Sequence, residues 1–146
     1  MIHFEGVESF PTPSADLYAK LADAGWLARA LPDAEVLEAA TDKATWKVKP
    51  KFAFMAGTLD TVAEVTGRTP VEQVRYRVTS TSVGAKSVAE ATLTVRPDGD
   101  GSEVQWSGDL TELGGLLKMV PRGLLQAAAQ KVIADVWAAL KQKAAG

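Results

Sequence analysis

The chain has 146 residues, of which 16 are basic and 18 acidic, and its formal charge is −2. This balance does not supply the concentrated basic surface that nucleic-acid binding requires. The chain has no cysteine and a single histidine, His3, which excludes disulfides, thiol chemistry and cysteine-ligated zinc, and argues against a histidine-based triad.

The sequence also shows no targeting signal. The first ten residues lack the basic start and continuous apolar core of a signal peptide, and no run of about 18 uncharged apolar residues could form a transmembrane helix. We therefore expect one cytoplasmic domain covering residues 1–146, with no catalytic residue, no metal site and no cofactor.

The N-terminal segment predicts a strand followed by two short helices. Apolar residues and a glycine alternate with polar ones over Ile2–Phe10, which is typical of a strand. Thr12 suits the N-cap of a first helix and Pro13 its first residue. Ala24-Gly25 is expected to separate this helix from a second one, which ends near Pro32-Asp33.

The central part of the chain has a period of two, interrupted by short turn sequences rich in Gly, Pro and Asp. Short connections join neighbouring strands that pair antiparallel. The predicted strands are Glu35–Ala40, Ala44–Phe54, Thr58–Thr66, Val71–Ser80, Lys86–Arg96 and Glu103–Thr111.

The last third predicts a Gly- and Leu-rich connection over residues 111–123 and a helix from Leu124 to about Lys143. About 20 helical residues span about 30 Å, the width of a small domain. One helix cannot cover a flat sheet of this size, so the sheet must curl around it. The fold class expected is α+β: a helix-grip fold with a curved antiparallel sheet of about seven strands around the long C-terminal helix.

Local motifs resemble a known superfamily. Phe10-Pro11-Thr12-Pro13, residues 17–23 and Leu31-Pro32-Asp33 resemble the opening of the START/Bet v1-like (SRPBCC) superfamily. In the tail, Gly108-Asp109-Leu110, Gly115-Leu116-Leu117 and residues 128–133 resemble its CoxG branch, named after the CoxG subunit of carbon monoxide dehydrogenase. The superfamily implies a deep pocket for lipids, polyketides, steroids or quinones. The branch implies an accessory role beside a molybdenum oxidoreductase, through membrane recruitment or quinone handling.

Small residues on the Lys86–Arg96 strand oppose Ala127, Ala128 and Ala129 of the helix. Such a pattern either brings helix and sheet together or leaves a void, and by itself it favours close packing. The resemblance favours a pocket instead, and with it the non-enzymatic binding of a hydrophobic, lipid- or quinone-like molecule. The predicted pocket residues are Trp46, Phe52, Phe54, Leu59, Tyr76, Ala89, Ala91, Leu93, Trp106, Leu117, Val120, Leu124 and Ala128.

Two further segments allow two interpretations each. Gly114, Gly115 and Met119 could form a gate to the pocket or a site of transient membrane contact, or they could belong to an ordinary connection. Lys43, Lys47, Lys49 and Lys51 could dock to an acidic partner or anionic lipid; we favour the alternative, a lysine-protected edge strand.

Two other functions remain open. A small polyketide cyclase or hydrolase would require polar groups inside the pocket, and the inward candidates are Tyr76, Thr61 and Ser87. An interaction module, such as a chaperone-ATPase activator of the same fold, would act through an exposed surface.

Overall fold

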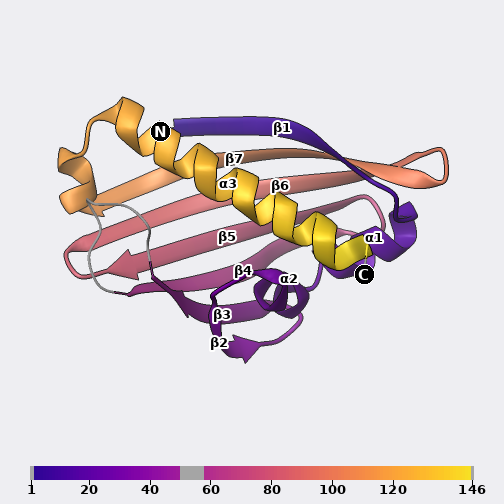
Figure 1. Ribbon diagram of the computed structural model, residues 1–146, viewed down its shortest axis with the longest axis horizontal. Helices are drawn as coiled ribbons and strands as arrows, with labels where there is room; N and C mark the ends of the chain where they lie inside the picture. Colours follow the sequence, from indigo (N-terminus) through magenta and orange to yellow (C-terminus); the bar gives the residue numbers. More distant parts are fainter. Residues whose placement is uncertain (1, 50–57, 146) are drawn as a thin grey trace.

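A computed structural model describes residues 2–49 and 58–145, in which seven antiparallel strands form one sheet (Figure 1). The strand order is β1-β7-β6-β5-β4-β3-β2, and the predicted helix-grip fold is confirmed. The elements are β1 (Ile2–Phe10), α1 (Ser14–Leu21), α2 (Ala24–Ala30), β2 (Glu35–Ala39), β3 (Lys43–Val48), β4 (Leu59–Thr69), β5 (Gln73–Ser82), β6 (Ala85–Asp98), β7 (Gly101–Gly115), the 3₁₀ helix η1 (Leu116–Met119) and α3 (Arg122–Ala145).

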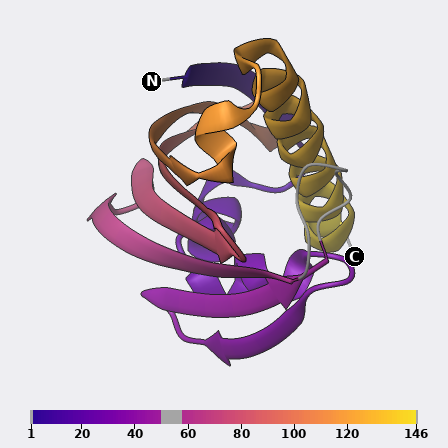
Figure 2. The ribbon, with the colours of Figure 1, turned by 90° about the vertical axis from the view of Figure 1, so that its left-hand side faces the viewer.

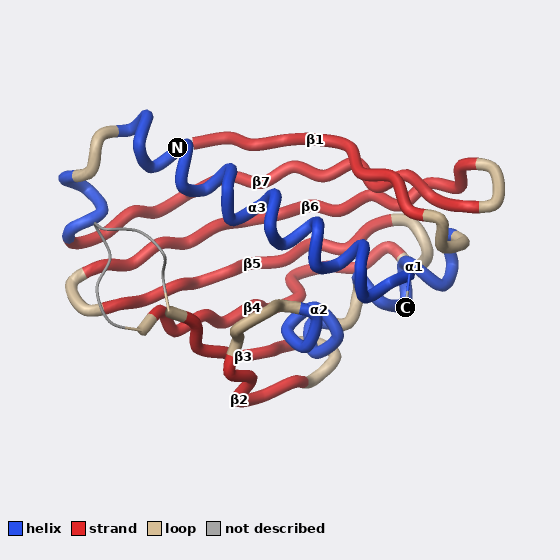
Figure 3. Tube along the Cα trace, in the orientation of Figure 1, coloured by secondary structure: helices blue, strands red, loops and turns tan. Residues whose placement is uncertain are grey.

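The sheet is strongly curved, and α3 lies across its open side (Figure 2). α1 and α2 lie near the C-terminal end of α3, whereas η1 precedes its N-terminal end (Figure 3). Within the described part of the chain, no helix combines the length and the apolar character needed to cross a bilayer.

Buried side chains gather in two clusters towards opposite ends of α3. The larger cluster joins α1, α2 and the end of α3, and includes Leu17, Leu21 and Trp137. The smaller cluster joins β1, η1 and the start of α3 through Phe4 and Leu125, among others. The centre of the concave sheet surface lies between these two ends.

The starts of the two short helices differ from the prediction. Pro13, which has an extended backbone, occupies the N-cap of α1 in place of Thr12. Asp23 caps α2, since its carboxylate accepts hydrogen bonds from the amides of Gly25 (2.9 Å) and Trp26 (3.2 Å). Ala24 and Gly25 therefore begin α2, and the prediction that they interrupt helical structure was wrong.

The lysine-rich strand is not an edge strand, which corrects the favoured interpretation. β3 pairs with β2 on one side and with β4 on the other. Lys43 lies opposite Glu64, and Lys47 opposite Asp60, with 3.9 Å between the Lys47 Nζ and Asp60 Oδ1 atoms. These lysines thus form cross-strand charge pairs. β3 ends at Val48, and the predicted continuation to Phe54, which includes Lys51, lies outside the described residues.

Candidate functional site

Small side chains form the centre of the concave sheet surface. In the register of the sheet, Val78 of β5 lies opposite Ala89 of β6, and Ala91 of β6 lies opposite Gly108 of β7. We call these four residues the concave floor. They share a face with the buried Leu93, yet all four are only half-buried. Apolar residues at the centre of a sheet are normally covered, so α3 does not rest on this floor.

Two inward-facing glycines show where the uncovered space lies. A Cβ atom at Gly108 would meet only the carbonyl oxygen of Glu90, at 3.8 Å. A Cβ atom at Gly6, on the neighbouring strand β1, would lie 2.7 Å from the Trp106 indole ring. The floor is therefore open above Gly108 and closed at Trp106.

Three hydroxyl groups cross the concave surface beside the floor. Thr61 lies opposite Ser80, and Ser80 lies opposite Ser87; the Thr61 and Ser80 hydroxyl oxygens are 3.3 Å apart. Thr61 is buried and the two serines are half-buried. Such a hydroxyl row can orient the polar end of an otherwise apolar ligand. Sequence analysis missed Ser80, although it alternates with Tyr76 and Val78 on the same face.

α3 presents a different flank to each side. Gln130, Ala134 and Lys141 face β1. Leu124, Ala128 and Val132 follow one another four residues apart and so lie on another flank. Leu124 is 50% and Val132 47% exposed, so this flank is an incompletely covered apolar surface.

Exposed apolar side chains also occur where η1 meets the turn between β5 and β6. Met119 is 82% exposed, Val83 80% and Leu116 54%. The Leu116 amide donates a hydrogen bond of 2.6 Å to the Gly84 carbonyl oxygen, which ties η1 to this turn. Together with Leu124, these three residues are called the apolar end.

The other predicted residues fall into three groups. Tyr76, Leu93 and Trp106 belong to the packed wall: the Tyr76 hydroxyl donates to the Leu21 carbonyl oxygen at 2.5 Å, and the Trp106 ring centroid lies 6.0 Å from that of Trp137. Leu117 and Val120 pack in the smaller cluster, while Trp46 and Leu59 are half-buried on the concave face. Phe52 and Phe54 lie outside the described residues.

The predicted gate begins later than expected. Strand β7 continues to Gly115, where the prediction ended it at Thr111, and Gly114 and Gly115 pair with Lys86 and Ala85. Gly115 has a φ of +62°, and a Cβ atom there would overlap the Gly84 carbonyl oxygen. These glycines therefore serve a tight backbone approach at the end of the sheet.

The curved sheet, the long C-terminal helix and the floor between them define a protein of the START/Bet v1-like class. A conserved protein from Geobacillus kaustophilus is similar, with a TM-score of 0.85 and 18% identity over 99% of this chain and 95% of that one. A START superfamily protein from Mycobacterium smegmatis has a TM-score of 0.69 and 11% identity over 97% and 96%. Ara h 8.0201 has a TM-score of 0.66 and 12% identity over 98% and 97%.

Residues 6–145 match the CoxG family, described by the CoxG subunit of carbon monoxide dehydrogenase. The chain belongs to this family, as the tail motifs predicted. No curated protein matches it. The three solved structures share less than a fifth of their residues with this chain and thus show the fold alone.

Proposed function

We propose that this protein binds a hydrophobic small molecule, lipid- or quinone-like, on the concave floor and does not transform it. The observation that carries the proposal is the space above Gly108, over a floor of small apolar side chains that α3 leaves uncovered. Concave, mostly apolar sites with a few placed polar groups are typical of small-molecule binding.

The polar groups beside the floor suit holding a ligand better than transferring protons. The hydroxyls of Thr61, Ser80 and Ser87 can donate or accept hydrogen bonds but do not titrate near neutral pH. The hydroxyl of Tyr76 is engaged with the Leu21 carbonyl oxygen, and burial raises the pKa of Tyr76 above its ordinary value. The arrangement therefore favours a binding protein over a cyclase or hydrolase.

The apolar end is the proposed place of ligand entry and transfer. Met119 and Leu116 are exposed beside Leu117, which packs in the core, so a short movement of η1 would uncover apolar surface. We propose that Met119 moves as the gate and that Gly114 and Gly115 anchor it to the sheet. Membership of the CoxG family extends the proposal to exchange of the ligand with a membrane or a redox enzyme.

A pair of leucine variants tests the binding site. Gly108→Leu should fill the space above the floor, whereas Ser107→Leu adds the same side chain to the opposite face of the same strand. A quinone analogue or a long-chain fatty acid at a hundredfold excess over Kd should stabilise the parent by about 2.7 kcal/mol. Ser107→Leu should retain this effect and Gly108→Leu should lose it, in a thermal-shift series.

Native mass spectrometry of the gently purified protein provides an independent readout of a retained apolar molecule. If no quinone analogue or fatty acid raises the melting temperature of the parent, ligand binding is refuted and the interaction module replaces it. If Gly108→Leu binds as the parent does, the ligand lies elsewhere.

A further inference from the structure

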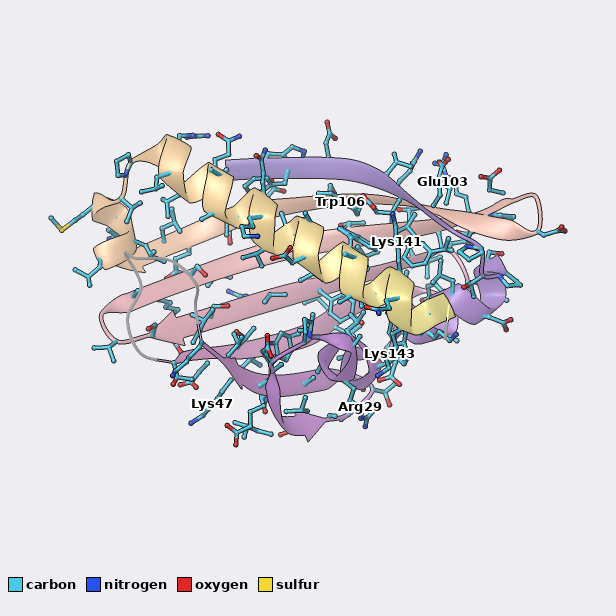
Figure 4. The ribbon with its side chains drawn as sticks, in the orientation of Figure 1. Arg29, Lys47, Glu103, Trp106, Lys141 and Lys143 are labelled. Carbon is cyan, nitrogen blue, oxygen red and sulfur yellow. The ribbon has the colours of Figure 1, made fainter. Side chains whose placement is uncertain are left out.

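A groove of about 530 Å³ lies between the edge strand β1 and the outer flank of α3. Phe4, Trp106, Ile133 and Trp137 supply its apolar lining, and Glu8 and Lys141 are among its charged residues. Trp106 and Lys141 both lie in the region between β1 and α3 (Figure 4). The Gln130 and Ala134 flank of α3 borders this groove, so it is separate from the floor around Gly108.

Glu8 is held at the wall of this groove by two partners. It lies on the inward face of β1, in line with Phe4 and Gly6. Its Oε1 atom accepts a hydrogen bond of 2.8 Å from the Lys141 ammonium, and its Oε2 atom accepts one of 3.5 Å from the Trp106 indole nitrogen. An ammonium group beside an indole is thus already present in the groove.

Carboxylates outnumber ammonium groups here. Glu5 and Glu8 line the groove together with Lys141 and His3. Asp109 lies beside it, with its Oδ1 atom 2.7 Å from His3 Nδ1. The groove thus combines an excess of negative charge with aromatic side chains, two features that attract organic cations.

We propose that the β1–α3 groove binds a small organic cation, an alkyl- or arylammonium compound. Its ammonium group takes the place of the Lys141 ammonium at Glu8, and its apolar part contacts Trp106 and Ile133. The side chain of Lys141 is 42% exposed, so it can turn into water when the ligand enters.

Other occupants fit less well. An anion bound to Lys141 would lie close to Glu8, whose carboxylate is 2.8 Å from the Lys141 ammonium, and would meet the charge of Glu5 as well. A neutral apolar molecule that displaced Lys141 would leave the Glu8 carboxylate partly desolvated without a counter-charge, which is unfavourable. A cation alone replaces the lost partner.

The test uses benzyltrimethylammonium, with benzoate and benzyl alcohol as anionic and neutral probes of similar size. The indole NH signal of Trp137 and isothermal titration calorimetry report binding to the full chain. We expect saturable binding of the cation and weaker binding of both other probes. Glu8→Gln should weaken cation binding at least about tenfold, the equivalent of one charge-assisted hydrogen bond.

Two further variants make the result decisive. Lys141→Met removes the internal competitor and should tighten cation binding. Glu112→Gln makes the same charge change at an exposed carboxylate outside the groove, where Glu112 pairs with Lys86 at 3.7 Å, and should leave binding unchanged. Preference for benzoate, absence of saturable binding, or weaker binding to Lys141→Met would overturn the proposal. Should Glu8→Gln not fold, Lys141→Met decides, since it keeps the carboxylate. The result is independent of ligand binding on the concave floor.

Discussion

The two inward-facing glycines of neighbouring strands provide a direct test of where the concave surface is open. Gly6 and Gly108 both lie within strands and face α3, and neither has a positive φ. The same substitution by alanine should therefore have opposite effects at the two positions, because the surroundings of the new methyl group differ.

At Gly108 the added methyl group meets only a carbonyl oxygen, at 3.8 Å. Glycine inside a strand costs about 0.5–1 kcal/mol relative to alanine, so Gly108→Ala should stabilise the protein by about that amount. At Gly6 the methyl group would lie 2.7–2.9 Å from three atoms of the Trp106 indole, which itself packs against Trp137. Overpacking of this kind costs about 1–3 kcal/mol.

Urea unfolding followed by circular dichroism measures both changes, and a constant m-value would show that the unfolded states are comparable. The free energies of unfolding of the two variants should differ by about 1.5–4 kcal/mol. If Gly108→Ala is destabilised as much as Gly6→Ala, the space above the floor is filled and the reasoning is refuted.

Three further predictions concern the edges of the site. Gly115→Ala should destabilise the protein by more than about 1 kcal/mol because the φ of Gly115 is +62°, whereas Gly114→Ala should be near neutral in the same urea titration; equal effects would contradict the backbone geometry. Tyr76→Phe should cost about 1–3 kcal/mol by leaving the Leu21 carbonyl oxygen without its partner. Burial raises the pKa of Tyr76, so its stabilising contribution is complete below a pH of about 10 and is lost as pH rises through the raised pKa; the parent should lose stability in alkali more steeply than the variant, and parallel pH profiles would argue against this. Asp23→Ala should cost about 1 kcal/mol through loss of the α2 cap, and an unchanged melting temperature would show that the cap contributes nothing.

Local periodicity in the sequence was sufficient to predict the architecture. Strand β1 begins and ends as predicted, because strict alternation over Ile2–Phe10 is stopped by the two prolines that follow. The long C-terminal helix and the antiparallel pairing also followed from the 3.6-residue period and the short turns. Short motifs in the tail were sufficient to predict the CoxG family. These features depend on residues close together in the chain.

Pairings between distant residues decided what the periodicities could not. β3 became an interior strand because β2 pairs outside it, and β7 extends to Gly115 because β6 continues beside it to Ala85. Ser80 joins Thr61 and Ser87 only through the register of three strands.

The open part of the concave surface was likewise set by the tertiary structure alone. Gly6 and Gly108 look alike in the sequence, yet the Trp106 indole fills the space above one and nothing closer than a carbonyl oxygen lies above the other. Glu8 occupies an inward position that alternation alone would assign to an apolar residue, and Lys141, near the opposite end of the chain, makes that position tolerable. Curvature of the sheet and the path of α3 determine these contacts, and both arise from packing among residues far apart in sequence.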